Sequence, residues 1–262
     1  MDSKEIEKQA AEVQEWVAMR AEKGEAFLRD VNVDGVDMTP YEDKVIVDVG
    51  CGPRPFVEFY PARAGFMLDC CMREYRREQL LQSETPKKVL CVDCMAEHLP
   101  LRTGAVDHVF SINMLDHCYD PESVVKEFRR VIKPGGWIHL NVDIGGEATP
   151  CEPIVFSEER LDEMFDGLQL VYKGSGTPSH PGREAMVMRV YRWADGAAEG
   201  TCEPSRDVRV ASEVSVVERS LEYLACPTCR GPLQLRTGLV CETCDHAYPI
   251  EDGIAMLKPA SA

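Results

Sequence analysis

The chain has 262 residues, enough for one large domain and a small module. Its formal net charge of −16 disfavours DNA or RNA as a substrate, because proteins that grip phosphate backbones usually carry basic surfaces. No apolar run approaches the roughly 20 residues that span a bilayer, and the charged N-terminus lacks the apolar stretch of a secretory signal. We therefore expect no membrane contact and a cytoplasmic location.

The predicted elements begin with a helix over residues 3–29, where apolar residues recur at helical spacing. Strands and helices then alternate. The predicted strands cover 44–49, 65–69, 88–92, 106–112 and 136–142, with a closing pair at 168–172 and 185–193. The predicted helices cover 72–82, 121–132 and 157–165. This alternation predicts a parallel sheet covered by helices on both faces.

The composition changes after the last predicted strand. Residues 196–217 lie in a stretch rich in Ala, Gly, Glu, Asp and Ser without sustained periodicity, which is typical of a linker. We expect a helical cap over 1–34, a main domain over 35–195, this linker, and a separate module over 218–262.

The first strand of the main domain runs directly into a Gly-x-Gly turn. The run Val45–Val49 contains Asp48, and Gly50, Cys51 and Gly52 follow it directly. Residues without Cβ atoms let such a turn bend tightly and bring its backbone close to a ligand. Asp69 ends the next strand, where an acid can accept hydrogen bonds from both ribose hydroxyls. An ordinary tight turn, a dinucleotide site and a site for a nucleoside without pyrophosphate remain open at this point.

Four cysteines near the C-terminus have the spacing of a metal site. Cys226-x-x-Cys229 is followed by 11 residues and then Cys241-x-x-Cys244. Two such hooks form a tetrahedral four-cysteine zinc site with no vacant position, so we expect a structural Zn²⁺. A module this small needs a bound metal of this kind to fold, because its apolar core is too small to stabilise it alone.

Longer motifs carry a family resemblance. After the Gly-x-Gly turn come Ala96-Glu97-His98-Leu99-Pro100, Val106-Asp107-His108-Val109 and Glu127-Phe128-Arg129-Arg130-Val131-Ile132-Lys133-Pro134-Gly135-Gly136. In this order they resemble the motifs of class I S-adenosylmethionine (SAM)-dependent methyltransferases. The resemblance implies a methyltransferase with SAM as its cofactor and a Rossmann-like, seven-stranded α/β sheet with helices on both faces.

The resemblance also implies the cofactor site. The loop at Asp48 would cradle the methionine moiety, Asp69 the ribose, Met95 and Ala96 the adenine, and Asn113 would lie near the sulfonium. The full set of expected cofactor-binding residues is Asp48, Gly50, Cys51, Gly52, Asp69, Cys70, Asp93, Met95, Ala96 and Asn113.

Three residues on the same edge are candidates for the chemistry. A general base assists methyl transfer when the acceptor atom belongs to a hydroxyl. His117, Asp143 and His180 follow predicted strands and are candidates for this role, although His117 can equally cap the site structurally. The sequence after the fourth strand, Ser111-Ile112-Asn113-Met114, lacks the Pro-Pro motif of enzymes that methylate amide or adenine nitrogens. We therefore expect O-methylation of a small-molecule or carbohydrate acceptor.

The C-terminal module resembles the small zinc-ribbon activator subunit of RNA and protein methyltransferases, from Leu221 through Ile254. This resemblance implies docking on a methyltransferase domain, either within the chain or across a homodimer. Three alternatives stay open: a methyltransferase of a translation component, a metalloid methyltransferase that uses the scattered cysteines, and a non-catalytic SAM-binding scaffold.

Overall fold

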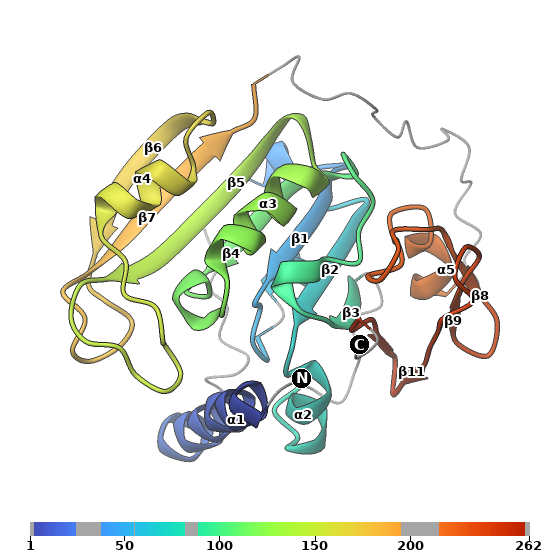
Figure 1. Cartoon of the computed structure of the whole chain (residues 1–262), viewed down its shortest axis with the longest axis horizontal. Coiled ribbons are helices and arrows are strands. Elements are labelled where there is room, and N and C mark those ends of the chain that lie inside the picture. Colours follow the sequence, from blue (N-terminus) through green and yellow to red (C-terminus); the bar gives the residue numbers. More distant parts are fainter. Residues whose placement is uncertain (1–2, 25–37, 55, 82–88, 195–214, 260–262) are drawn as a thin grey trace.

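The computed structural model describes residues 3–24, 38–54, 56–81, 89–194 and 215–259. Strands and helices alternate through the main domain, and a small β-rich module follows at the C-terminal end (Figure 1). None of the helices in these ranges is both long and apolar enough to cross a membrane.

One large sheet forms the frame of the main domain. Its strands from this domain are β1 (Val45–Val49), β2 (Ala64–Asp69), β3 (Val89–Asp93), β4 (Val106–Ile112), β5 (Ile132–Ile144), β6 (Gln169–Gly176) and β7 (Ala185–Arg192). They lie in the order β3-β2-β1-β4-β5-β7-β6. The first five pair in parallel, whereas β7 runs antiparallel to β5 and β6. The Rossmann-like α/β fold is therefore confirmed.

The main domain contributes the seven predicted strands, but the described sheet has nine. The two extra strands, β11 (Ile250–Glu251) and β12 (Ile254–Met256), come from the C-terminal module. β12 pairs in parallel with β3, with Ala255 opposite Val92. Without β12, the free edge of β3 would present unpaired backbone N–H and C=O groups, so a strand added there satisfies them.

The faces of the sheet are covered by separate apolar clusters. On one face, α3 (Pro121–Val131), α4 (Glu158–Met164) and the module pack on alternate strand residues such as Val47 and Leu68. On the other, α2 (Met72–Arg77) packs against residues such as Ile46 and Met67. Since both faces are covered, every residue of β1 is buried, which explains why all of its residues except Asp48 are apolar.

Helix starts follow the expected capping chemistry. The Asp120 carboxylate accepts the amide of Ser123 at 3.0 Å, and Pro121 occupies the first turn of α3. The Ser157 hydroxyl likewise accepts the amide of Arg160 at 3.3 Å and caps α4. The predicted helix over 72–82 ends earlier, at Arg77, because Gln79 adopts a left-handed conformation with φ of 56°.

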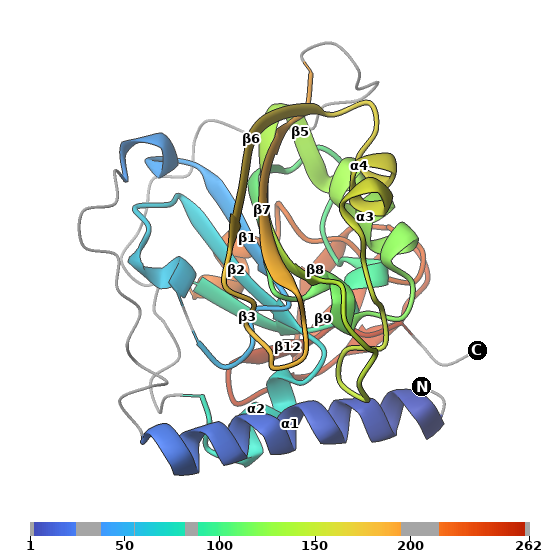
Figure 2. The same cartoon turned by 90° about the vertical axis from the view of Figure 1, so that its left-hand side faces the viewer.

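The N-terminal helix α1 (Ser3–Lys23) lies across the carboxyl ends of the strands (Figure 2). Residues 25–29 of the predicted helix lie outside the described residues. Val13 packs into the apolar cluster beside α2, and Arg20 donates to the carbonyls of Glu78 and Gln79 at 2.9 and 3.2 Å. The helix therefore covers the sheet edge at which the predicted site residues converge.

The C-terminal module contains α5 (Val216–Ser220) and a three-stranded sheet of β8 (Leu233–Leu235), β9 (Leu239–Cys241) and β10 (Ala247–Tyr248). It packs within the chain against the loop after β3: the amide of Ala225 donates to the carbonyl of Pro100 at 3.0 Å. Arg230 donates to the carbonyl of Leu99 at 2.7 Å and pairs with Glu127 at 3.0 Å. Most of the predicted linker lies outside the described residues, so the expected domain boundaries stay a prediction.

Candidate functional site

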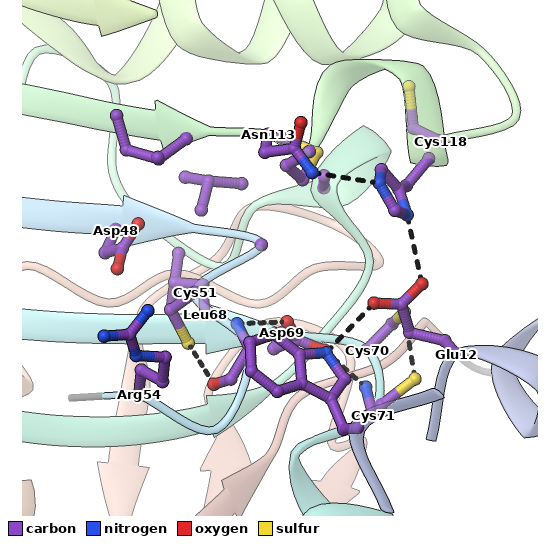
Figure 3. A pocket seen from close by; sticks show the side chains of 18 of the residues that line it. Glu12, Asp48, Cys51, Arg54, Leu68, Asp69, Cys70, Cys71, Asn113 and Cys118 are labelled. Atoms are coloured by element: carbon purple, nitrogen blue, oxygen red, sulfur yellow. Dashed lines mark hydrogen bonds and ion pairs between the residues drawn. The ribbon is translucent and has the colours of Figure 1, made fainter. Parts of the chain in front are cut away.

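A cavity of about 690 Å³ opens at the carboxyl ends of β1, β2, β3 and β4, beneath α1. This volume lies within the usual range for small-molecule and cofactor sites. Figure 3 shows Asp48, Asp69 and Asn113 near the ends of neighbouring strands, with Glu12 of α1 facing them. Nine of the predicted cofactor residues line the cavity: Asp48, Gly50, Cys51, Gly52, Asp69, Cys70, Met95, Ala96 and Asn113.

The Gly-x-Gly turn at the end of β1 requires its glycines. Gly50 and Gly52 have φ of 70° and 58°, a region in which side chains are strained. A Cβ on Gly52 would lie 2.9 Å from the ring of Trp16 on α1, and one on Gly50 would collide with Met114. The bare backbone therefore forms one wall of the cavity.

Asp69 is fixed at the end of β2 by two backbone donors. The amide of Gly52 donates to Oδ2 at 2.9 Å, and that of Cys71 donates to Oδ1 at 2.8 Å. Burial raises the pKa of Asp69 to about 6, while these two hydrogen bonds act in the opposite direction. The carboxylate is thus oriented toward the cavity before any ligand arrives.

Asp48 lies deeper, with 1% of its surface exposed. Among the described residues, neither of its carboxylate oxygens has a hydrogen-bond partner. Burial and the neighbouring Asp69 raise the pKa of Asp48 well above its ordinary value. A cationic ligand would gain binding free energy beside such an acid, because it would supply the partner that the buried carboxylate lacks.

Asp93, by contrast, does not line the cavity. It is completely buried at the end of β3, where Lys258 of the C-terminal module pairs with it at 2.5 Å and the amide of Arg73 donates to it at 3.2 Å. Lys258 also donates to the carbonyl of Cys70 at 2.8 Å. Asp93, predicted to bind the cofactor, instead joins the module to the cofactor edge through Lys258.

The predicted catalytic residues meet at the other end of the cavity. His117 and His180 both line it, their ring centroids 5.5 Å apart. Asn113, with φ of 53°, directs its Nδ2 to His117 Nε2 at 3.5 Å and to His180 Nδ1 at 3.4 Å. Asp143 is fully buried and outside the lining, and it accepts the amides of Ser179 and His180 at 2.8 and 2.9 Å. Asp143 thus holds the loop that carries His180.

The loop containing His180 begins later than predicted. The strand before it was predicted to end at residue 172, but β6 continues to Gly176. Pairing with β7, which places Gly174 opposite Met188, overrides the local preference of the glycines for a turn.

Carboxylates surround the two histidines. Glu12 accepts from His117 Nδ1 at 3.0 Å, and Glu15 lies 3.5 Å from His180 Nε2. Glu152 is 2% exposed; its Oε1 forms an ion pair with His180 Nδ1 and lies 3.8 Å from His117 Nε2. The hydrogen bond to Glu152 raises the pKa of His180 to about 9 despite its burial.

Burial acts to lower the pKa of His117, but its bond to Glu12 outweighs that effect and raises the pKa. Neither Glu12 nor Glu15 was expected at the site, because the sequence of a charged helix does not indicate which part of the fold the helix will pack against. Glu152 is likewise absent from the predicted site residues.

The four C-terminal cysteines gather in one cluster, with all sulfur atoms within 4.8 Å of one another. Cys226 and Cys244 Sγ are 3.8 Å apart, and Cys229 and Cys241 Sγ are 3.4 Å apart. Four sulfurs at about 2.3 Å around one Zn²⁺ would be about 3.8 Å apart, so the cluster fits the ion. The Tyr248 hydroxyl lies 3.1 Å from Cys226 Sγ and adds a polar contact to the cluster.

Several other cysteines line the cavity: Cys51, Cys70, Cys71, Cys94 and Cys118. Burial raises the pKa of Cys51 and of Cys94 well above the ordinary value for a thiol. These two side chains are therefore neutral thiols near pH 7, which are weaker ligands for metalloids than thiolates.

Two regions of the chain match known families. Residues 47–140 match the methyltransferase domain family, and residues 218–253 match the Trm112p-like protein family. The chain therefore carries a methyltransferase domain followed by a Trm112p-like domain, and both sequence resemblances are confirmed.

Curated relatives cover the first of these regions. The ubiquinone biosynthesis O-methyltransferase of Chromobacterium violaceum is 35% identical over 104 residues, which are 37% of this chain and 44% of that protein. The protein of the same name from Cupriavidus pinatubonensis is 31% identical over 150 residues, which are 53% of this chain and 58% of that protein. The chain spans about half the length of these relatives.

Solved structures share the fold. The complex of the Haloferax volcanii Trm112 methyltransferase activator with the protein described there as a methyltransferase contains a chain with a TM-score of 0.50 and 18% identity; the match covers 72% of this chain and 98% of that one. A Bacillus halodurans protein, also described as a methyltransferase, has a TM-score of 0.50 and 13% identity, over 61% of this chain and 100% of that one.

Proposed function

We propose that the chain transfers a methyl group from SAM to an oxygen atom of a small-molecule or carbohydrate acceptor. The observation that carries this proposal is the fixed carboxylate of Asp69 at the end of β2. Each of its oxygens accepts one backbone amide and keeps lone-pair capacity for a further donor. A carboxylate held in this way suits two neighbouring ribose hydroxyls. The O-methyltransferase names of the curated relatives support the same conclusion.

The cavity residues fit SAM in charge and shape. SAM carries a sulfonium and an ammonium group against a single carboxylate, so its net charge is positive. Asp48 and Asp69 give the cofactor end of the cavity two acids, and the bare turn at Gly50 and Gly52 leaves room for close approach of the methionine moiety. Met95 and Ala96, on the loop after β3, would flank the adenine, as the resemblance implies.

When bound, SAM supplies an electrophilic methyl group whose displacement leaves a neutral thioether. The residues of the chain then have to hold the acceptor in line and manage its proton. His117 Nδ1 and His180 Nε2 are turned toward Glu12 and Glu15. The opposite nitrogens, Nε2 of His117 and Nδ1 of His180, both face Asn113. An acceptor hydroxyl can approach His117 Nε2, whereas it would have to displace Glu152 to reach His180 Nδ1. Asp143 holds the His180 backbone in place.

The covered cavity favours a small acceptor. Residues of α1 that line it are Lys8, Gln9, Glu12, Glu15, Trp16, Met19 and Lys23. A nucleic acid or folded protein would have to displace this helix to reach Asn113, whereas a small molecule fits beneath it. The acidic chain and the missing Pro-Pro motif point the same way.

We assign the Trm112p-like domain a supporting role, with a structural Zn²⁺ held by Cys226, Cys229, Cys241 and Cys244. Attachment through the chain raises the effective concentration of the domain at its docking surface. Its contacts with Asp93 and with the carbonyl of Cys70 bring this support to the cofactor edge. Docking across a homodimer is the alternative for the same surface.

The test is calorimetric titration of S-adenosylhomocysteine into the zinc-loaded full chain. We expect micromolar binding by the wild type and a loss of at least tenfold, about 1.4 kcal/mol, in Asp69→Asn. Asp166→Asn, an exposed acid-to-amide change beyond α4, is the matched control and should bind like the wild type. Absence of binding by a folded wild-type chain would overturn the proposal.

A further inference from the structure

The acceptor end of the cavity brings together three side chains with metal-ligand atoms. These are His117 after β4, Glu152 after β5 and His180 before β7. One ligand atom from each lies within 4.8 Å of the others. His117 Nε2 and Glu152 Oε1 are 3.8 Å apart, slightly wider than the ~3.4 Å expected of two ligands about 2.1 Å from a tetrahedral ion. His180 Nδ1 and Glu152 Oε1, by contrast, are in direct ion-pair contact, closer than two ligands of one ion. Binding of an ion would therefore replace this contact, with Glu152 and His180 moving apart and His117 moving inward.

The outward-facing atoms of both rings are also arranged as in metal sites. A metal-bound histidine almost always donates its other N–H to a carboxylate, a carbonyl or water, which fixes the tautomer. Here His117 Nδ1 faces Glu12 at 3.0 Å, and His180 Nε2 faces Glu15 at 3.5 Å. Each ring is therefore oriented by an acid of α1, and its remaining nitrogen points to the common centre.

Glu152 is held from behind in the same manner. Arg183 donates from Nε to Glu152 Oε2 at 3.0 Å, which leaves Oε1 on the side of the two histidines. Asn113 faces the same centre, and its Oδ1 is buried with no hydrogen-bond partner among the described residues. Turning the amide of Asn113 over would bring this oxygen to the ring nitrogens as a further ligand.

We propose that His117 Nε2, His180 Nδ1 and Glu152 Oε1 bind a divalent transition-metal ion at the acceptor end of the cavity. Two imidazole nitrogens and one carboxylate oxygen suit Zn²⁺, Co²⁺, Fe²⁺ or Mn²⁺ rather than the all-oxygen sites of Mg²⁺ and Ca²⁺. Three protein ligands leave coordination positions for an exogenous group, unlike the closed set of four cysteines.

The position of the site suggests what the ion does. His117, His180 and Asn113 all line the cavity, so an ion between them faces the space left for the acceptor. There it would hold an acceptor that offers oxygen atoms, such as a hydroxyl beside a second oxygen. This role rests on the proposed function; binding of the ion does not. In this arrangement the two histidines serve as ligands in place of the general-base role predicted for them.

The probe is Co²⁺, titrated into full-length chain whose cysteine cluster has first been loaded with one equivalent of Zn²⁺. We expect one further ion to bind, without the thiolate-to-cobalt charge-transfer absorption that would report exchange into the cysteine cluster. Absence of binding beyond the cysteine cluster in the wild type overturns the proposal and needs no variant to interpret.

Variants place the ion. His117→Ala, His180→Ala and the conservative Glu152→Gln should each weaken the second Co²⁺ by at least tenfold. His98→Ala and Glu159→Gln make the same changes at exposed positions and should leave it unaltered. Far-UV circular dichroism and zinc content verify folding of each variant. Undiminished binding in folded His117→Ala and Glu152→Gln contradicts the assignment.

Titration of S-adenosylhomocysteine into the same samples separates the two proposals. Binding of S-adenosylhomocysteine without a second Co²⁺ leaves the methyltransferase proposal standing and removes the metal site. A second Co²⁺ sensitive to these substitutions, without S-adenosylhomocysteine binding, does the reverse.

Discussion

The cysteine cluster and the histidine–glutamate cluster are built in opposite ways. The four cysteines sit on two turns of one small module, and two of them, Cys226 and Cys241, are buried. The histidine–glutamate cluster draws His117, Glu152 and His180 from three loops of the main domain and opens into a cavity. The comparison shows two arrangements of metal-ligand side chains. Four cysteines can fill all positions of a tetrahedral ion and hold a module together, whereas two histidines and one glutamate would leave positions open for a ligand.

The largest effect on stability should come from removing one cysteine of the four-cysteine cluster. Cys226→Ser removes one of four thiolates, and structural zinc contributes on the order of 10 kcal/mol to the folding of small zinc modules. We expect the zinc content to fall from one ion per chain to nearly none, with loss of amide-exchange protection in β8 and β9. Cys151→Ser, a cysteine outside both clusters, is the control. Retained protection in zinc-free Cys226→Ser would show that the module folds without the metal.

Lys258 tests how far the module reaches into the main domain. Lys258→Met leaves the fully buried Asp93 without its cation, and breaking such a pair costs about 3 kcal/mol. We expect that loss in the free energy of unfolding measured with urea. Lys173→Met breaks a pair with Glu158 in which both side chains are more than one third exposed, and should cost less than about 1 kcal/mol.

A second change separates the ion pair from the packing around it. Asp93→Asn in the Lys258→Met background removes the uncompensated charge and should recover most of the stability. If the double variant is no more stable than Lys258→Met alone, the loss comes from the packing of the lysine stem.

Asp69 gives the cofactor end its own pH dependence. Its pKa is raised to about 6, so the carboxyl gains a proton as the pH falls through 6 and loses one of its acceptor oxygens. We expect the dissociation constant of S-adenosylhomocysteine to rise about tenfold per pH unit below 6 if only the ionised form binds, and to be flat from pH 7 to 8.

Besides burial, the neighbouring carboxylates Glu12 and Asp93 raise the pKa of Asp69, so a cationic ligand should lower it. In the free protein the native pKa exceeds the unfolded value. The native state therefore binds more protons between about pH 4 and 6, and stability falls as the pH rises through that window. A flat binding profile from pH 5 to 8 would contradict a role for the Asp69 carboxylate.

The same contrast explains what the sequence predicts well. Cys226 and Cys229 lie three positions apart on one turn, so their spacing alone indicates a shared ligand. The order of the main-domain elements is equally local, since each strand and helix has its own periodicity and caps. The Gly50 turn and Asp69 lie at the ends of strands that the local sequence pattern already predicts, so their positions can also be predicted.

What the sequence missed depends on distant partners. β12 is a three-residue strand whose partner, β3, lies about 160 positions earlier, so the local sequence pattern does not predict that β12 joins the large sheet. Glu12 and Glu152 reach His117 only because α1 and the loop after β5 fold onto the same edge. Contacts of this kind depend on the topology of the fold, and the spacing of residues within one short segment does not predict them.

The smallest expected effect concerns the acids of α1 and bears most directly on the open cluster. Loss of an acid that orients a metal-bound histidine costs roughly 10- to 100-fold in metal affinity. Glu12 lies 3.0 Å from His117, whereas Glu15 lies 3.5 Å from His180, so Glu12→Gln should weaken the second Co²⁺ about tenfold and Glu15→Gln less. Glu22→Gln, on the same helix outside the cavity lining, is the control for helix charge. Equal affinity in all three variants would mean that α1 only covers the cavity, and graded losses in the expected order would make this helix part of the metal site.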